Sequence, residues 1–126
     1  MQEENKIATQ IIGAAIDVHR ELGPGLLESA YASCLTMELR ERGLFVEKEK
    51  SLPVIYKGNE IDCSYRIDLL VENLVVIELK AVGLVMPIHQ AQTLKYLKLS
   101  GKKLGLILNF NETLLKDGIS RIIHRK

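Results

Sequence analysis

The first part of the chain alternates between apolar and polar positions with the period of an α-helix. One side of that helix carries apolar residues at spacings of three and four: Ile7, Ile11, Ala14, Ala15, Val18 and Leu22. This spacing predicts an amphipathic helix over the first twenty-odd residues. It ends at Gly23-Pro24-Gly25 because Gly accepts a left-handed cap and Pro cannot continue a helix. A second helix is predicted from about Leu27 to Arg42, with Gly43 as its stop.

From Leu44 onward the pattern changes to that of extended chain. Strands are predicted at 44–50, 52–56, 61–71, 74–80, 104–110 and 119–123, with turns at 57–60 and 72–73. Pro53 places its strand at a sheet edge or a bulge, and Pro87 opens a third helix that runs to about Leu99. The strand at 104–110 is almost wholly apolar, which is typical of burial on both faces. This order of elements predicts an α/β protein in which helices cover a mixed sheet.

Composition narrows the class of protein. The 126 residues fit one domain over 1–126, and 47% apolar with 26% charged residues excludes a disordered chain. A net charge of +1 argues neither for nor against a polyanionic partner. With 5% aromatic residues and no Trp, an aromatic platform for stacking bases is not expected. Cys34 and Cys63 are too few for a disulfide framework and are expected to be reduced thiols. Because no signal peptide or membrane span is evident, we expect a soluble cytoplasmic protein without a membrane partner.

The segment Leu74–Lys80 carries the candidate chemistry. Side chains alternate along a strand, so Glu78 and Lys80 share one face and Leu79 points to the other. Asp68 lies ten residues before Glu78 on the preceding strand, where a hairpin can place the two carboxylates opposite each other. Two such groups repel unless a cation lies between them, and Mg²⁺ would supply that charge. Spacing alone leaves open a second interpretation, in which Glu78 and Lys80 form an exposed ion pair and Asp68 is an unrelated surface acid.

Three motifs together resemble a known family. Asp68 followed by Glu78-Leu79-Lys80 is similar to the D…(D/E)-x-K signature of the PD-(D/E)xK nuclease superfamily, although Ile67 stands where that signature has Pro. The segment 25–31 reads G-x-x-E-x-x-Y, the motif of the GxxExxY branch of that superfamily. The segment 89–96 resembles the Q-x-x-x-Y helix of RecB-type nucleases. The resemblance runs from about Ile11 to Ile123 and keeps the motifs in order.

The resemblance implies a restriction-endonuclease-like fold of three layers, a mixed central β-sheet flanked by α-helices. It also implies a metal-dependent nuclease in which Asp68 and Glu78 ligate Mg²⁺ or Mn²⁺ with the backbone carbonyl of Leu79. Glu28 would add a carboxylate, directly or through water. Such a metal stabilises charge on the phosphate and lowers the pKa of its bound water.

The resemblance assigns further catalytic roles. Lys80 would position or activate the attacking water, while Gln92 and Tyr96 would orient water or the nucleic-acid backbone. The simpler interpretations are an exposed Gln92 and a core tyrosine with one hydrogen bond at Tyr96, and also at Tyr31. For Glu28 the simpler interpretation is stabilisation of a helix N-terminus. His19 and His89 either lie near the site or are satisfied, half-buried histidines, and we favour the latter for His19.

Basic residues follow the third helix. Lys95, Lys98 and Lys102 are spaced to form one stripe that could contact phosphates, although a solvated helix face explains the same pattern. Four more cations could extend it: Lys103, Arg121, Arg125 and Lys126. The nearly neutral charge fits a homodimer or a partner protein that adds grip on the substrate. Two other functions stay open: a non-catalytic nucleic-acid-binding or accessory protein, and a metal-dependent enzyme for a smaller phosphodiester.

Overall fold

The computed structural model describes residues 1–125, apart from the side chains of residues 63 and 64. Its elements, in chain order, are α1 (Gln2–Leu22), α2 (Glu28–Glu41), β1 (Val46–Tyr56), β2 (Asn59–Val71), β3 (Val75–Lys80), α3 (Pro87–Ser100), β4 (Leu104–Asn109), the 3₁₀-helix η1 (Leu115–Gly118) and β5 (Ile119–Ile123). Among these described residues, no helix combines the length and apolar character that crossing a membrane requires. The expectations for the Cys63 thiol and for Lys126 lie outside the described residues.

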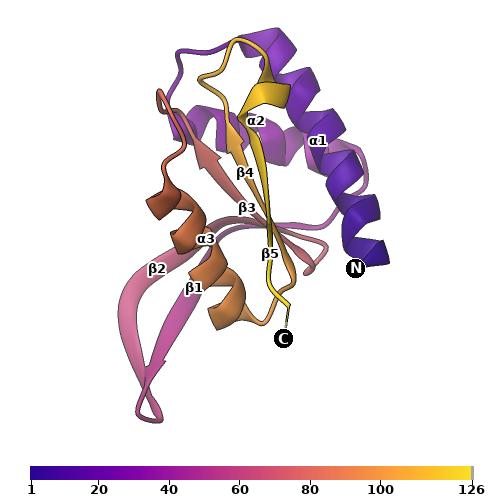
Figure 1. Cartoon of the computed structure of the whole chain (residues 1–126). Helices are drawn as coiled ribbons and strands as arrows, with labels where there is room; N and C mark the ends of the chain where they lie inside the picture. The colour runs from indigo at the N-terminus through magenta and orange to yellow at the C-terminus, as the bar shows by residue number, and fades with distance from the viewer. Residues whose placement is uncertain (126) are drawn as a thin grey trace.

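The five strands form one sheet in the order β1-β2-β3-β4-β5. The β3–β4 pair is parallel and the other pairs are antiparallel, so the sheet is mixed, as the sequence predicts. One hydrophobic core joins the sheet to α1 and α2, and a second, smaller core joins it to α3 (Figure 1). The sheet therefore lies between two helical layers, and each strand of its centre is buried on both faces.

The predicted strands at 44–50 and 52–56 form one long strand. The bulge expected at Pro53 is present, because the β1–β2 register shifts between Leu52 and Val54. Pairing with β2 continues on both sides of this shift, from Leu52–Tyr65 to Val54–Ile61, so the extra residues lie on β2 and the irregularity does not end β1. β1 is an edge strand of the sheet, which is the other position that tolerates proline. The short helix η1 has no counterpart among the elements predicted from the sequence.

The larger core is centred on a stacked aromatic pair. Tyr31 and Phe110 are fully buried, with ring centroids 4.5 Å apart and an angle of 16° between the rings. The Tyr31 hydroxyl donates to the carbonyl of Gly23 at 2.6 Å and accepts from the backbone N–H of Leu26 at 3.1 Å. Tyr31 is thus a satisfied core tyrosine. It fixes the loop between α1 and α2, and with it the position of the first turn of α2.

Candidate functional site

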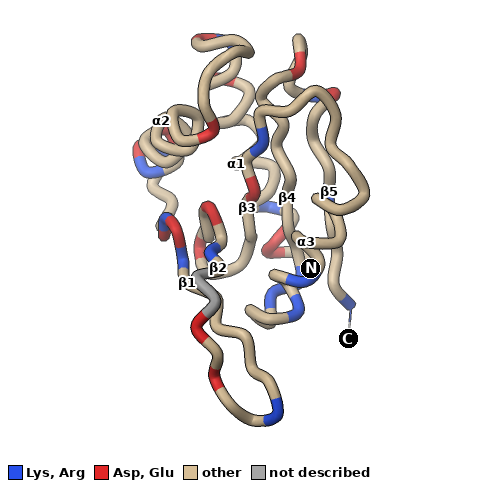
Figure 2. Tube along the Cα trace, turned by 90° about the vertical axis from the view of Figure 1, so that its left-hand side faces the viewer, with Lys and Arg blue, Asp and Glu red and all other residues tan. Residues whose placement is uncertain are grey.

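Glu78 and Lys80 share one face of β3, as the alternation predicts. Glu78 is 5% exposed and lies on the side of α3 with Val76, whereas Leu79 belongs to the core beneath α1 and α2. Lys80 is half-buried at the end of the strand. Figure 2 shows an acidic and a basic position close together along β3. A carboxylate on a strand covered by helices carries a desolvation penalty, so Glu78 differs from an ordinary surface acid.

Asp68 and Glu78 hold each other through the backbone. The backbone N–H of Asp68 donates to Oε2 of Glu78 at 2.9 Å, and the N–H of Leu79 donates to Oδ2 of Asp68 at 2.9 Å. These two bonds continue the β2–β3 pairing beyond the last regular pair, Leu69 with Ile77. Each carboxylate therefore stands where a ladder carbonyl would otherwise accept. This geometry excludes the interpretation of Asp68 as an unrelated surface acid.

The chain changes its facing at Asp68. Ile67 packs in the core beside α3, but Leu69, two residues later, packs in the core beneath α1 and α2. Residues two apart in a regular strand lie on the same face, so β2 must twist sharply between them. On β1, the residue between the pairs that flank Asp68 is Glu49, which has a left-handed backbone with φ 50°. The irregularity therefore involves both strands at the position of Asp68, whose Oδ2 accepts the N–H of Leu79.

Burial and like charge raise the pKa of both carboxyl groups. Desolvation followed by the neighbouring Asp68 charge raises the pKa of Glu78 to about 8. Desolvation is also the largest cause of the raised pKa of Asp68, and the carboxylates of Glu28 and Glu49 add to it. The Lys80 charge and the backbone hydrogen bonds act in the opposite direction on both groups. The protein alone therefore compensates the two negative charges only in part.

Glu28, on α2, lies near the Asp68 and Glu78 carboxylates at the end of β3. It lies in the first turn of that helix, and its Oε2 accepts the backbone N–H of Ala81 at 3.2 Å. Position in the first turn is favoured by the helix dipole, which is the simpler interpretation of this residue. The bond to Ala81 adds a second role, because it ties α2 to the end of β3 immediately after Lys80. Glu28 is thus close enough to raise the pKa of both Asp68 and Glu78.

A cavity of about 230 Å³ opens beside this cluster. Its lining comes from α2, β1, β2 and β3: Glu28, Ser29, Ala32, Ser33, Lys48, Glu49, Asp68 and Leu79. Glu49 and Lys48 are the charged members that the sequence analysis missed. Their acidic and basic neighbours on β1 look like an ordinary solvated strand, so no signal in the sequence distinguishes them.

Gln92 and Tyr96 lie on α3, on the other side of the cluster. Tyr96 is buried beside Leu97, and its pKa is raised by desolvation first and then by the charges of Glu78 and Asp68. Gln92 is exposed and forms a side-chain hydrogen bond with Tyr96. The Tyr65 ring of β2 lies 6.3 Å from that of Tyr96. Tyr96 is therefore a core residue that also lies within electrostatic range of the carboxylates.

The two histidines are satisfied by other groups. His19 is buried, and its Nε2 lies 2.8 Å from the carbonyl oxygen of Glu112, in agreement with a satisfied histidine. His89 accepts the backbone N–H of Met86 at Nδ1, at 2.9 Å, and so caps the start of α3. Neither contact involves the carboxylate cluster.

The lysine stripe needs a correction. Lys95 and Lys98 are exposed on α3, but the helix ends at Ser100, and Gly101 adopts a left-handed backbone. Lys102 therefore follows the helix, so helical spacing does not place it on the stripe. Arg121, expected as an extension, donates to Asn5 on α1 at 2.8 Å.

Among the described residues, no group of three or more Asp, Glu, His or Cys side chains is close enough together to hold a metal ion. The pair Asp68 and Glu78 remains, with Glu28 engaged at Ala81. Mg²⁺ is commonly held by one or two carboxylates together with water molecules. Two partly compensated carboxylates fit that requirement in donor chemistry.

Comparison with known proteins identifies the family. A family model described as the PD-(D/E)XK nuclease superfamily matches residues 5–122. No curated protein and no solved structure matches the chain. The match extends over nearly all described elements, and the mixed sheet between helices is consistent with the restriction-endonuclease-like fold. The chain belongs to the PD-(D/E)XK nuclease superfamily.

Proposed function

We propose that this protein is a divalent-metal-dependent nuclease that hydrolyses phosphodiester bonds in nucleic acid. The observation that carries the proposal is the pair Asp68 and Glu78. Each member accepts a backbone N–H from the other's strand, burial raises the pKa of both, and the Asp68 charge raises the pKa of Glu78 further. A purely structural pair would gain more from apolar residues of similar size, because burying uncompensated charge destabilises a fold.

Mg²⁺ or Mn²⁺ is the proposed cofactor. Asp68, Glu78 and the backbone carbonyl of Leu79 would hold it, with Glu28 acting directly or through water. When bound, such an ion offsets charge on the phosphate and lowers the pKa of water.

The remaining roles belong to the chain's own side chains. Lys80 contributes a positive charge beside the carboxylates, where it offsets negative charge that develops on the phosphate and orients the attacking water. Gln92 and Tyr96, which are hydrogen-bonded to each other, orient water or the sugar–phosphate backbone from the side of α3. Lys95 and Lys98 contact phosphates further along that helix.

Within the superfamily, we propose that the chain belongs to the GxxExxY branch. The support is Tyr31, whose hydroxyl anchors the loop before α2 and thereby sets Glu28 against Ala81. We propose a cytoplasmic location, consistent with the free thiol of Cys34. A homodimer or a partner protein would add contacts to the substrate.

A non-catalytic nucleic-acid-binding role is the second candidate function. The exposed lysines of α3 favour it, because phosphate contacts alone suffice for binding. An enzyme acting on a smaller phosphodiester is a third candidate, since the cavity of about 230 Å³ is of modest size.

A cleavage panel separates these functions. Labelled single-stranded, duplex and branched DNA and RNA are incubated with Mg²⁺, Mn²⁺ or Ca²⁺, and with chelator. We expect at least one substrate to be cut with Mg²⁺ or Mn²⁺, and no cutting by Glu78→Gln. The control variant Glu21→Gln makes the same chemical change on exposed α1 and should cut normally. Binding without cutting by freshly purified wild type would establish the accessory role.

Metal binding is measured independently of cutting. Isothermal titration with Mn²⁺ should give binding that Asp68→Ala abolishes and Glu21→Gln retains. Equal binding by wild type and Asp68→Ala would refute the proposed metal site.

A further inference from the structure

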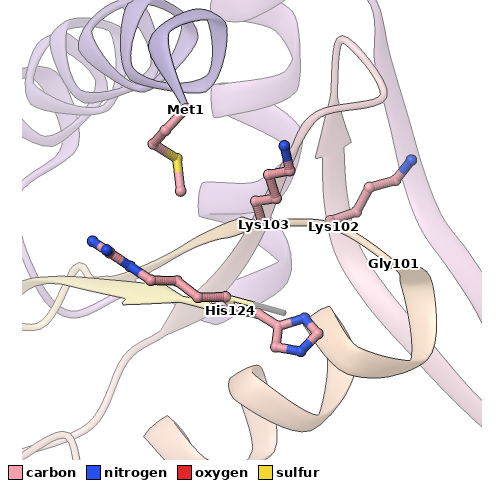
Figure 3. A pocket seen from close by; sticks show the side chains of 6 residues that line it. Met1, Gly101, Lys102, Lys103 and His124 are labelled. Carbon is pink, nitrogen blue, oxygen red and sulfur yellow. The ribbon is translucent and has the colours of Figure 1, made fainter.

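A second pocket lies at the opposite end of β3 and β4 from the carboxylates. Its volume is about 520 Å³, and its lining comes from three separate parts of the chain: Met1, Gly101, Lys102, Lys103, His124 and Arg125. Figure 3 shows these parts, with Met1 at the start of α1, Gly101 to Lys103 after α3, and His124 after β5. We call this the basic pocket.

Backbone hydrogen bonds fix the walls of the basic pocket. The N–H of His124 donates to the carbonyl of Lys103 at 2.9 Å, which joins the tail after β5 to the start of β4. The N–H of Lys102 donates to the carbonyl of Leu97 at 3.1 Å, across the left-handed Gly101. The backbone positions of the basic side chains are therefore set by the fold.

The charge of the basic pocket is not neutralised locally. No acidic residue is among its described lining residues, and the ion pairs of the described chain involve neither Lys102, Lys103 nor Arg125. Lys103 and Arg125 are exposed and Lys102 is half-buried. With a net charge of +1 for the whole chain, three clustered cations form a local positive field that attracts anions.

The basic pocket is connected to the carboxylate site by a row of lysines. Along β3 and β4 the two ends of the sheet are five residues apart, about 17 Å at the rise of a strand. Along α3 the path from Gln92 to Ser100 is eight residues, about 12 Å at the rise of a helix, and Lys102 follows two residues later. Lys95 and Lys98 lie on this path, and both are exposed.

We propose that the basic pocket binds phosphate groups of a nucleic-acid strand, at a distance from the bond that the carboxylate site cleaves. The position of the cleaved bond rests on the proposed nuclease function, whereas binding at the pocket does not. A strand is favoured over a small phosphorylated ligand because the cations are largely exposed and continue as a row along α3. Lysine suits this task as a point charge that contacts phosphate without reading sequence.

The test compares two triple variants that remove equal charge. Lys102→Gln/Lys103→Gln/Arg125→Gln empties the basic pocket of its cations. The control Arg20→Gln/Lys57→Gln/Lys116→Gln removes three exposed cations elsewhere. Binding of a labelled duplex is followed by fluorescence anisotropy between about 50 and 200 mM salt. We expect the pocket variant to bind at least about tenfold more weakly at the low end of that range, and its dependence of log K on log salt to be shallower by about 2 to 3.

The control variant should retain most of the affinity and salt dependence of wild type. Equal losses in both triple variants would show that only net charge matters, and would overturn the basic pocket as a site. Circular dichroism and the urea midpoint of each variant confirm that the fold is intact. If the triple variant unfolds, the single variant Lys103→Gln replaces it, with an expected loss of about threefold and a slope change of about 1.

Two further arms identify the source of the phosphate. A nucleoside triphosphate should compete only weakly with the duplex. Strong competition that is lost in the pocket variant would make this a nucleotide site and overturn the proposal for a strand. In the second arm, duplexes shorter than about five steps beyond the cut should be insensitive to the pocket variant, because the separation of about 17 Å along β3 and β4 corresponds to about five steps of 3.4 Å each.

These outcomes are distinguishable from failure of the nuclease proposal. Anisotropy is measured without divalent metal and with Glu78→Gln as well as wild type. Loss of binding in the pocket variant, in a protein that cuts nothing, supports the pocket and refutes the nuclease. Cutting that is unchanged by the pocket variant on every substrate length refutes the pocket and keeps the nuclease.

Discussion

The two ends of the β3–β4 pair differ in the sign of their charges and in how deeply those charges are buried. At the carboxyl end, Asp68 and Glu78 are held at the centre of the sheet; burial raises the pKa of both carboxyl groups, and the Asp68 charge raises the pKa of Glu78 further. At the amino end, Lys102 and Lys103 stand in an open pocket without a described acidic partner. Buried charges are costly to folding and respond strongly to a bound cation, whereas exposed charges cost little and act at a distance. The comparison suggests that chemistry and affinity are assigned to different ends of the same strands.

The carboxyl end also contains an irregular stretch of backbone beside the carboxylates. Glu49 adopts a left-handed conformation opposite Asp68, although it is not a glycine. In the basic pocket the left-handed position is Gly101, which adopts it without a Cβ penalty, whereas the turn before β3 has left-handed backbone at Glu72 and Asn73. Strain of this kind persists where the surrounding structure holds it in place, and it is often found at functional sites.

The largest expected effect is on turnover at the carboxyl end. Lys80→Ala should reduce cleavage by about 10²- to 10⁴-fold, because the positive charge that offsets the phosphate is lost. Mn²⁺ affinity, measured by titration calorimetry, should change much less, since the carboxylates remain. Lys116→Ala on η1 is the matched control and should cut normally. An unfolded Lys80→Ala protein would instead assign Lys80 a structural role.

The arrangement of Asp68, Glu78 and Lys80 can largely be predicted from nearby residues in the sequence. Alternation along 74–80 predicts the facing of Glu78 and Lys80, and the turn at Glu72-Asn73 predicts that Asp68 returns opposite Glu78. The second prediction is confirmed by the two reciprocal hydrogen bonds, and the first agrees with the regular β3–β4 register from Val75 to Lys80. These features depend on near neighbours in sequence, for which strand geometry is a sufficient guide.

The remaining features depend on contacts that no local pattern reports. The reversal of facing between Ile67 and Leu69 lies opposite the left-handed backbone of Glu49, a residue that sequence rules would place in an ordinary strand. The basic pocket combines Lys103 with Arg125, which come together only after β5 pairs with β4. The expected stripe through Lys102 fails for a related reason, because Gly101 ends the helix first.

The next effect concerns stability at the carboxyl end. The folded state holds the Glu78 proton more tightly than the unfolded state, because its pKa is raised from 4.5 to about 8. The stabilisation is therefore complete below about pH 4.5 and is lost as pH rises toward 8. Urea unfolding of the metal-free protein should show Glu78→Gln to be more stable than wild type by about 2 kcal/mol at pH 8. The amide keeps an oxygen that can accept the N–H of Asp68.

This gain should disappear when Mn²⁺ is added, because only wild type gains stability from the ion. The pocket variant Lys102→Gln/Lys103→Gln/Arg125→Gln provides the contrast and should follow the same pH profile as wild type. Identical profiles for Glu78→Gln and wild type would mean that burial does not disfavour the Glu78 charge, and would remove the difference between the two ends.

A smaller effect tests the support of Glu28. Tyr31→Phe keeps the stacking on Phe110 but removes the hydroxyl that bonds Gly23 and Leu26. We expect a loss of about 1 to 2 kcal/mol in the free energy of unfolding, because a carbonyl and an N–H lose a buried partner. Cleavage should fall in parallel while duplex binding at the basic pocket is unchanged. The matched control is Tyr56→Phe on the exposed end of β1, which should leave both quantities unaltered.

The smallest effects compare the two left-handed residues directly. Gly101→Ala should destabilise the protein by about 1 kcal/mol, since no atom lies within 4 Å of the added Cβ and only the backbone conformation opposes it. Glu49→Gly should be neutral or stabilising by up to about 1 kcal/mol, because relief of the left-handed strain offsets the greater entropy of glycine in the unfolded chain. It also removes a carboxylate that raises the pKa of Asp68. Urea midpoints at pH 8 measure both changes. If Glu49→Gly instead destabilises the protein by more than Gly101→Ala, the Glu49 side chain makes a contact that outweighs its strain, and the backbone opposite Asp68 is not a site of net strain.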